Sequence, residues 1–351
     1  MMKTVAGKLR AGWAGRVAVC TGLACALAAP ITTLAGDAPR QGTLSFALIG
    51  DMPYGEREER RAREVIGAIN ASPAVEFVIH IGDIKGGGES CDDSVLRRRF
   101  RLFQEIAKPF VITPGDNDWT DCHRVSNGRH LPTERLARYR EIFHPDPARS
   151  TGGRSMALRP QSAVPGYEPY VENALWQAAQ VTFATVHVVG SHNGLDPWRE
   201  LDPDDSAARP RADRLAEVAQ REAAALAWLD ATFDSARAAG SLGVVIAIHG
   251  NPGLERTPGT GVPGPYDRFL ERLRRHTLAF GRPVLLLHGD THWFRHDRPW
   301  RGEDGRELTN FARVESFGSP FVNWVEVIVD PREPGLFRVV PRAVEPPPPM
   351  R

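Results

Sequence analysis

Residues that can bind a metal ion follow five short apolar segments of the chain. Each segment has the composition of a buried strand, and the polar residues just after these segments are Asp51, Asp83, Asp116, His249, Asp290 and His292. One aspartate after a strand is more often a turn-capping residue than a ligand. Five such endings are more informative, because ligands of α/β sheets bind where the strands end. The pattern predicts four carboxylates and two imidazoles around one point.

Carboxylates gathered in this way have a defined chemical use. Four of them close together would repel one another unless cations lie between them. Oxygen and imidazole ligands in combination suit Mn, Fe, Zn or Mg. Two such ions about 3.5–4 Å apart are a common device for the hydrolysis of phosphate esters. The residues therefore indicate metal-dependent hydrolysis of a phosphoester.

The elements that must position these residues alternate between strands and helices. The strands expected before the polar endings are Leu44–Ile49, Phe77–Ile81, Phe110–Thr113, Val244–Ile248 and Val284–Leu287. Helical patterns are Glu56–Asn70, Asp93–Ala107, Ala212–Ala238 and Tyr266–His276. This order predicts an α/β fold with parallel strands.

Further strands are expected over Val181–Val189, Leu308–Phe317, Trp324–Val329 and Leu336–Val340. The Pro- and Gly-rich stretch 145–180 is interpreted as an excursion with a short hairpin. No linker divides the rest of the chain, so a single domain is predicted over 36–345, with a disordered tail over 346–351.

The order and spacing of the polar endings resemble the calcineurin-like metallophosphoesterase superfamily. Its five blocks run D-x-H, G-D-x-x-D, G-N-H-D/E, H and G-H-x-H. The corresponding residues here are Gly50-Asp51, Gly82-Asp83, Gly115-Asp116-Asn117-Asp118, His249 and Gly289-Asp290-Thr291-His292. The resemblance extends over about residues 45–300, and it is closest to secreted bacterial members with the segments Gly-Asp-Ile-Lys and Pro-Gly-Asp-Asn-Asp-Trp-Thr-Asp-Cys-His.

The resemblance implies a fold and a metal centre. The fold would be a four-layer α-β-β-α sandwich of two mixed sheets flanked by helices, with the last three strands in the second sheet. Two divalent or mixed-valence ions would bind. The implied ligands are Asp51, Asp83 and His292 for one ion, and Asp83, Asp116, His249 and Asp290 for the other, with Asp83 bridging. This oxygen-rich set favours Mn, Fe or Mg over Zn.

The chain also departs from the family pattern. Pro53 stands where the first block has a histidine ligand, and Gly86 stands where the second block has its final aspartate. Asp116 replaces the ligand asparagine, and Asp290 replaces a histidine. Asn117 stands at the position of the catalytic histidine.

The missing catalytic histidine leaves a role that other residues could take. Asn117 could orient phosphate oxygens, and His123 could supply an imidazole or be a surface loop residue. Lys85, Arg124 and Arg129 are candidate phosphate clamps, although for each residue taken singly a solvated surface charge is the favoured interpretation. The remaining histidines near the strand ends are not assigned as ligands; they are His187, His192, His288 and His296.

The leading interpretation is a metal-dependent phosphoric ester hydrolase. It would cleave a small-molecule phosphate mono- or diester through a dinuclear centre and a metal-bridging hydroxide. The alternative is a non-catalytic or weakly active metal- or phosphate-binding protein with a degenerate site on the same fold. A hydrolase with a serine or cysteine nucleophile is disfavoured, because the chain has no G-x-S-x-G motif.

Charge and hydropathy limit the possible partners. The chain has 44 Lys+Arg and 43 Asp+Glu, a formal net charge of +1, so nothing in its charge favours nucleic-acid binding. No apolar stretch beyond the N-terminal segment reaches the roughly 20 residues of a transmembrane anchor. The sequence carries no signal for an oligomeric state.

Residues 1–35 have the pattern of a secretory signal peptide. They contain four basic residues and no acidic one, then an apolar run from Val17 to Ala29 and the small-residue site Thr33-Leu34-Ala35. We therefore expect a periplasmic or secreted protein whose mature chain starts near Gly36. Removal of this segment leaves Cys91 and Cys122, which we expect to pair in an oxidising compartment rather than remain as two buried thiols.

Overall fold

The computed structural model describes residues 42–255, 264–302 and 304–344. All of them belong to the second of two units into which the chain divides, Ala38–Arg351. The predicted signal peptide over 1–35 and the predicted tail over 346–351 lie outside the described residues. Within the described ranges, no helix is long and apolar enough to cross a lipid bilayer.

The first sheet has five strands in the order β12-β11-β1-β2-β3. Their bounds are β1 Leu44–Ile49, β2 Val75–His80, β3 Phe110–Ile112, β11 Trp324–Val329 and β12 Phe337–Arg342. The first three run parallel, while β11 is antiparallel to both β1 and β12. The sheet is therefore mixed, and the parallel strands β1 to β3 send their carboxyl ends to the same edge.

The second sheet has seven strands in the order β4-β5-β6-β7-β8-β10-β9. Their bounds are β4 Arg159–Pro160, β5 Ala174–Ala178, β6 Val181–Thr185, β7 Gly243–Ala247, β8 Val284–His288, β9 Arg295–Asp297 and β10 Phe311–Glu315. Strands β6, β7, β8 and β10 run parallel, and the outer strands β4, β5 and β9 pair in the antiparallel sense.

Alternating side chains of the strands create three apolar layers. The longer helices are α1 Gly55–Ala71, α2 Asp93–Phe103, α3 Pro132–Phe143, α5 Ala212–Ala238 and α6 Asp267–Phe280. Helices α1 to α3 pack on the outer face of the first sheet, and α5 and α6 pack on the outer face of the second. In β7, Ile246 points to α5 and α6 while Val245 points into the core between the sheets.

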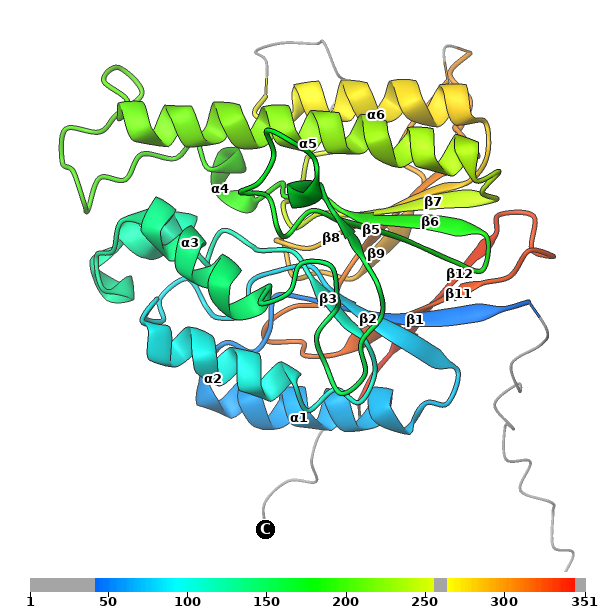
Figure 1. The fold of residues 1–351 in the computed structure, drawn as a ribbon, viewed down its shortest axis with the longest axis horizontal. Coiled ribbons are helices and arrows are strands. Elements are labelled where there is room, and N and C mark those ends of the chain that lie inside the picture. Colours follow the sequence, from blue (N-terminus) through cyan, green and yellow to red (C-terminus); the bar gives the residue numbers. More distant parts are fainter. Residues whose placement is uncertain (1–41, 256–263, 303, 345–351) are drawn as a thin grey trace, which may run out of the picture. The chain divides into compact units, whose positions relative to one another are not determined.

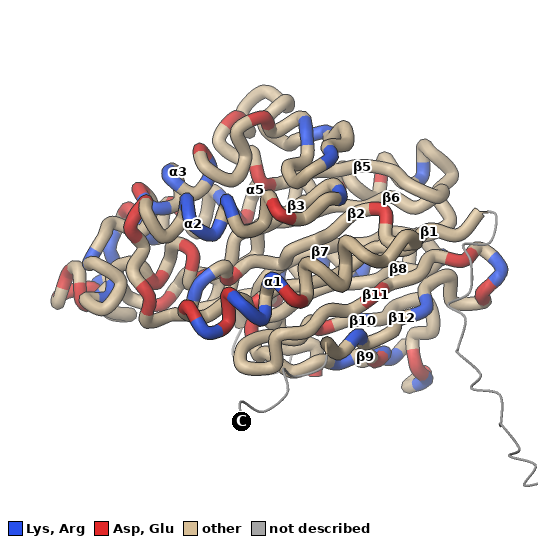
Figure 2. Tube along the Cα trace, turned by 90° about the horizontal axis from the view of Figure 1, so that it is seen from below, with Lys and Arg blue, Asp and Glu red and all other residues tan. Residues whose placement is uncertain are grey.

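The layers follow the order α-β-β-α, with α1 and α2 on one side of the strands and α5 and α6 on the other (Figure 1). This confirms the predicted four-layer sandwich of two mixed sheets. Lys, Arg, Asp and Glu are concentrated on helices and loops, and most strand segments are uncharged (Figure 2). That distribution is expected of strands buried between two other layers.

The last three strands differ from the prediction that placed them together in the second sheet. Only β10 joins that sheet, whereas β11 and β12 extend the first sheet from β1. Residues Val325, Val327 and Val329 of β11 point into the core between the sheets. Apolar alternation predicts such strands, but either sheet edge satisfies the same pattern. The choice of partner therefore could not come from the local sequence.

Other differences concern the middle of the chain. Helix α3 was not predicted, and the strand expected over Val181–Val189 ends at Thr185. The hairpin expected within 145–180 lies partly outside that stretch: β5 pairs with β4 inside it and with β6 beyond it, through a turn at Ala179 and Gln180, both with positive φ. The described residues also form short helical turns, which are η1 Thr120–His123, η2 Val125–Asn127, η3 Gln161–Ala163 and α4 Gly190–Asn193.

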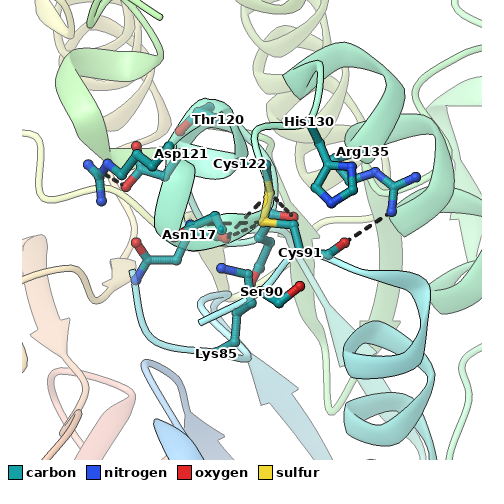
Figure 3. The surroundings of a disulfide bond; sticks show 12 residues. Lys85, Ser90, Cys91, Asn117, Thr120, Asp121, Cys122, His130 and Arg135 are labelled. Atoms are coloured by element: carbon teal, nitrogen blue, oxygen red, sulfur yellow. Dashed lines mark hydrogen bonds and ion pairs between the residues drawn. A yellow bond between two sulfur atoms is a disulfide. The ribbon is translucent and has the colours of Figure 1, made fainter. Parts of the chain in front are cut away.

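The predicted disulfide between Cys91 and Cys122 is present, with the two Cα atoms 5.8 Å apart. Cys91 lies between β2 and α2, and Cys122 lies in η1 after β3 (Figure 3). The bond therefore ties together the loops that follow two neighbouring strands.

Candidate metal centre

The carboxyl ends of strands from both sheets meet around His249, which follows β7. Its Nε2 atom lies 2.8 Å from Asp116 Oδ1 and 3.5 Å from Asp83 Oδ1. Asp290 Oδ1 is 4.0 Å from the same nitrogen. Asp83 and Asp116 follow β2 and β3 of the first sheet, while His249 and Asp290 follow β7 and β8 of the second. Four of the six predicted ligands thus converge from two sheets rather than from one edge.

The other two predicted ligands lie beside this group. His292 Nε2 is 3.7 Å from Asp51 Oδ1, and the backbone N–H of Asp290 donates to Asp51 Oδ1 at 3.1 Å. Asp51 follows β1 in the first sheet, whereas His292 and Asp290 follow β8 in the second. The structure therefore brings all six predicted residues to one place.

Two overlapping triads have ligand atoms that all lie within 4.8 Å of one another. One consists of Asp51, Asp83 and His249, and the other of Asp116, His249 and Asp290. The residue common to both is His249, whereas the family resemblance implied that Asp83 would be shared. Asp83 is nevertheless close to this shared residue, since its Oδ1 atom lies 3.5 Å from His249 Nε2.

Both histidines are oriented as metal ligands are. His249 Nδ1 lies 2.8 Å from the carbonyl oxygen of Ile81, and His292 Nδ1 lies 2.7 Å from that of Ser319. A carbonyl oxygen can only accept a hydrogen bond, so Nδ1 carries the proton in each ring. In the neutral ring this leaves the Nε2 lone pair facing the carboxylates, as in metal-bound histidines. The donor set therefore fits the cations that the resemblance implies.

Burial gives the group unusual protonation. It raises the pKa of Asp51 to about 8, and the nearby Asp290 adds to this, although His249 acts in the opposite direction. Burial also raises the pKa of Asp83 well above its usual value. Burial alone would lower the pKa of His249, but Asp83 and Asp116 raise it well above its usual value. Asp51 and Asp83 therefore need positive charge nearby in order to be ionised, and bound cations can supply that charge.

The backbone at four of the six residues is in the left-handed region. The φ angles are 51° at Asp51, 57° at Asp83, 79° at Asp290 and 70° at His292. This conformation is uncommon for residues other than glycine and costs on the order of 1–3 kcal/mol each. Such strain is concentrated at functional sites, because the surrounding structure must enforce it.

Glycines make the close approach of the carboxylates possible. A Cβ atom on Gly115 would lie 2.1 Å from Asp83 Oδ1, and one on Gly289 would lie 2.2 Å from Asp51 Oδ2. Each glycine directly precedes another predicted ligand. The Gly-Asp pairs of the sequence therefore serve two purposes, since the aspartate joins the group and the glycine leaves room for its neighbour.

Asp118 positions these loops and has a role that the sequence did not reveal. Its buried carboxylate accepts hydrogen bonds from the backbone N–H groups of Asp83 (3.0 Å), Ile84 (2.9 Å) and Gly115 (2.8 Å). These bonds join the loop after β2 to the loop after β3. The only sequence signal was its place at the acidic end of the third block.

Asn117 contacts Asp83 through both backbone and side chain. Its backbone N–H donates to Asp83 Oδ1 at 2.9 Å, and Nδ2 donates to Oδ2 at 2.6 Å. The residue at the family's catalytic position therefore lies directly against the ligand group.

Tyr54 is a further residue that sequence reasoning missed. Its hydroxyl donates to Asp83 Oδ2 at 2.9 Å and lies 3.2 Å from His292 Nε2. The same hydroxyl accepts a hydrogen bond from Asn117 Nδ2 at 3.2 Å. Its only sequence signal is its place beside Pro53, where the family has a histidine ligand.

Ser191 was also missed. Its hydroxyl donates to Asp116 Oδ2 at 2.7 Å and lies 3.1 Å from Asp121 Oδ1. It belongs to the loop that follows β6. The rule used for the other five strands, a polar residue after a buried strand, could have found it.

His123 lies in η1 and is buried. Burial lowers the pKa of its ring, and Arg124 lowers it further. Its Nδ1 atom is buried and makes no hydrogen bond within the described part of the chain. Over the same residues, no hydrogen bond or ion pair links His123 to the six predicted ligands. Its catalytic role stays a prediction.

Two of the three candidate phosphate clamps are engaged with other groups. Lys85 is buried, and its ammonium group donates to the carbonyl oxygens of Gly86 (3.3 Å) and Glu89 (3.0 Å). Arg124 pairs with Asp121 at 2.8 Å, and Arg129 is exposed.

The four unassigned histidines lie in different surroundings. His187 is buried against Glu172, with its Nδ1 atom 2.7 Å from the carboxylate. His192 is exposed and lies 2.7 Å from Asp196. His288 is buried at the end of β8, and His296 is exposed in β9.

Comparison with known proteins identifies the family. No curated protein sequence matches the chain. Among solved structures, GAP50, the anchor in the inner membrane complex of Plasmodium, is 11% identical, with 87% of this chain and 90% of that chain covered and a TM-score of 0.44. The protein TT1561 of Thermus thermophilus is 12% identical, with 85% and 99% covered and a TM-score of 0.42. The purple acid phosphatase PPD1 from yellow lupin seeds is 12% identical, with 83% and 50% covered and a TM-score of 0.43.

A family model described as calcineurin-like phosphoesterase matches residues 44–294. The matched range begins at β1 and ends just beyond His292, so it contains all six residues of the group. Since this range covers well over half of the sequence, the chain belongs to the calcineurin-like phosphoesterase family.

Proposed function

We propose that the protein is a metal-dependent phosphoesterase that hydrolyses a phosphate mono- or diester at this group of residues. Membership of the family supports a hydrolase of phosphate esters in general. The observation that carries the proposal is the convergence of four carboxylates on two imidazoles whose Nε2 atoms face them. A purely structural cluster would not need four like charges in one buried place.

Two divalent cations would be held by the residues of the two sheets. Asp51, Asp83 and His292 would bind one ion, and Asp83, Asp116, His249 and Asp290 would bind the other. The oxygen-rich set favours Mn, Fe or Mg, with Zn as an alternative. Bound there, the ions would activate water at neutral pH and neutralise charge that develops on the phosphoryl group.

Asn117 and His123 are the residues we place on the substrate side of the centre. Asn117 orients Asp83 through two hydrogen bonds, and we propose that its amide also binds a phosphate oxygen. His123 would donate a proton to the leaving group. The variant His123→Ala should keep its metal content and lose about 10²–10⁴ in turnover. Unchanged turnover would show that His123 is only a loop residue.

The decisive test compares Asp83→Asn with wild type. The substitution keeps the volume but removes a charge beside His249, so metal content should fall and hydrolysis of an aryl phosphate should be lost. Asp234→Asn is a matched control, because this exposed residue of α5 pairs with Arg237 on the surface. Metal content is read by elemental analysis and turnover by phosphate release. If Asp83→Asn retains both ions and wild-type turnover, the proposal is wrong.

A second candidate function is a binding protein on the same fold. Two observations favour it, since Pro53 offers no ligand atom and the amide of Asn117 is engaged with Asp83. Tight binding of cations and inorganic phosphate without turnover of any phosphoester would support this alternative.

We also infer that the protein is exported. The proposal rests on the basic, apolar and small-residue order within residues 1–35, and the disulfide is compatible with it. Sequencing of the mature N-terminus should start near Gly36, whereas recovery of intact Met1 from the cytoplasm would contradict export.

A further inference from the structure

Two aromatic side chains stand exposed next to each other. Trp293 is 64% exposed and Phe321 is 48% exposed, and their ring centroids lie 5.4 Å apart. Every other Phe, Tyr or Trp side chain in the described ranges is buried or half-buried. Solvent exposure of two large rings at one place costs favourable burial. Folding alone therefore gives no reason for this pair.

The pair is attached to the loops that hold His292. Trp293 directly follows His292 in the chain. Phe321 donates its backbone N–H to the carbonyl of Gly318 at 2.8 Å, and the N–H of Gly318 is 3.3 Å from the carbonyl of His292. Ser319, in the same loop, accepts the Nδ1 proton of His292. Both rings are thus placed by the backbone that positions a predicted ligand.

The inner side of the same two loops is packed. Phe294 stacks on Phe317 with ring centroids 5.0 Å apart, and both rings pack against the core between the sheets. Each loop therefore has one aromatic ring turned inward and one turned outward. The inner pair anchors the loops, so the exposed Trp293–Phe321 pair is held in place before any ligand arrives.

We propose that Trp293 and Phe321 form a stacking surface for a planar aromatic group carried by the phosphoester. This inference rests on the proposed function and adds a substrate class, namely phosphoesters that bear an aromatic ring. Aromatic faces attract other rings through offset or edge-to-face contacts, and exposed aromatics stack on nucleobases with little regard to their identity. The ring could belong to a nucleobase or to a simple aryl group.

The test uses pairs of substrates that share a reacting bond. AMP and ribose 5-phosphate are both esters of a primary alcohol, and only AMP carries a base. Benzyl phosphate and cyclohexylmethyl phosphate form a second pair that differs in the planarity of the ring. For wild type, kcat/KM should favour the aromatic member of at least one pair. The pair that responds identifies the source of the ring.

The variants Trp293→Ala and Phe321→Ala should remove this preference. Stacking is worth about 1–3 kcal/mol per base, so we expect kcat/KM for the aromatic substrate to fall by roughly 5- to 160-fold while the non-aromatic partner is unaffected. Trp293→Phe keeps a ring and should retain most of the preference. Leu278→Ala is the matched control, because Leu278 is 52% exposed on α6. If both alanine variants retain the wild-type preference, or if wild type shows none, the stacking surface is refuted.

A binding measurement separates this proposal from the proposed function. Calorimetry on the protein as purified compares the dephosphorylated compounds adenosine and benzyl alcohol with ribose and cyclohexylmethanol, which bind without turnover. Tighter binding of an aromatic member that is lost in Trp293→Ala would support the surface even if wild type hydrolysed none of the four esters. Hydrolysis of all four at equal rates, with no binding preference, would uphold the phosphoesterase and overturn the surface.

Discussion

The residues that depart from the family pattern show how the centre is completed here. Pro53 removes a histidine ligand, and the next residue, Tyr54, brings a hydroxyl to the carboxylate Asp83 and to His292. The hydroxyl also accepts from Asn117, which stands at the family's catalytic position. Tyr54 therefore connects two positions that depart from the family pattern, because it directly follows Pro53 in the chain and its hydroxyl is hydrogen-bonded to Asn117. We interpret Tyr54 as the residue that holds Asp83 and Asn117 in their observed orientation.

Removal of the Tyr54 hydroxyl should weaken metal binding without unfolding the protein. Partners of metal ligands typically affect affinity by about 10- to 100-fold, so Tyr54→Phe should lower the affinity for Mn²⁺ by roughly tenfold, as read by calorimetry. Tyr167→Phe, which alters a half-buried tyrosine between β4 and β5, is the control. Equal affinities of Tyr54→Phe and wild type would show that the hydroxyl only packs against Asp83.

The sequence could predict which candidate ligands come together, but not all of their neighbours. Gly-Asp pairs and histidines after apolar strands carry a local signal, and all six residues named from that signal converge. Tyr54 contacts the group from a loop that no motif marks, and Ser191 follows a buried strand but was not selected. A hydroxyl has no spacing rule, because its contact depends on how the loop folds in three dimensions.

At the scale of elements, the loops after β2 and β3 are the ones that need restraint. They carry Asp83 and Asp116, they are joined by Asp118, and the disulfide Cys91–Cys122 closes the same pair of loops. Backbone hydrogen bonds flank both cysteines, from Cys91 N–H to the Asn127 carbonyl and from His130 N–H to the Cys122 carbonyl. The disulfide therefore belongs to the scaffold of the candidate centre.

Loss of this disulfide should destabilise the protein and loosen the centre. With a sequence separation of 31 residues, the chain-entropy relation gives about 3–4 kcal/mol of unfolding free energy. The double variant Cys91→Ser/Cys122→Ser should show this loss in urea unfolding. Wild type under reducing conditions should behave in the same way, and it serves as the control for the serine side chains. A change below about 0.5 kcal/mol in both would contradict the expected loss.

At the scale of elements, the sequence predicts only part of the fold. Periodicity located the central strands and α5, because these elements are long or strongly apolar. It missed α3, although Leu136, Tyr139 and Phe143 recur at helical spacing, and it assigned β11 and β12 to the wrong sheet. The pairing of β11 with β1 joins residues such as Leu44 and Val329, which are far apart in sequence. Such a pairing depends on packing between the sheets, which a local pattern does not contain.

For the whole molecule, the candidate centre joins the two sheets. His249, from the second sheet, bonds the carbonyl of Ile81 in the first, and the N–H of Asp290 bonds Asp51. The N–H of Ser319 donates to the carbonyl of Asp51 at 2.9 Å. Cations held between these side chains would bind residues of both sheets at once. Metal binding should therefore stabilise the entire fold and not only the loops.

Removal of the metal should lower global stability by an amount set by mass action. A cation present at about 100 times its Kd contributes about 2.7 kcal/mol. Because two cations are proposed, chelation should lower the unfolding free energy of wild type by roughly twice that amount, with one cooperative transition throughout. In Asp83→Asn the same treatment should change little, whereas Asp234→Asn should follow wild type. A chelator effect of equal size in Asp83→Asn would place the stabilising ion elsewhere.

The acid stability of the metal-free protein should depend on His80, the last residue of β2. This ring is fully buried, and burial lowers its pKa to about 3 from an ordinary value of 6.5. Its Nδ1 atom accepts a hydrogen bond from the N–H of Gly82 at 3.0 Å, so Nε2 carries the proton and faces the carbonyl of Met52. A second proton on Nδ1 would break the bond to Gly82 and place a charge in an apolar core.

The direction of the effect follows from linkage. Below pH 6.5 the unfolded chain binds a proton at His80 while the folded protein does not, so unfolding becomes easier as the pH falls. The slope approaches about 1.4 kcal/mol per pH unit between the two pKa values. Buried carboxylates whose pKa is raised, such as Asp51, change stability in the opposite direction, so the slope must be read as a difference between two proteins.

Urea unfolding at pH values of about 7, 6 and 5 should show a steeper loss of unfolding free energy in wild type than in His80→Gln, whose amide can still accept a hydrogen bond from Gly82. Parallel curves for the two proteins would mean that the pKa of His80 is the same in the folded and unfolded states.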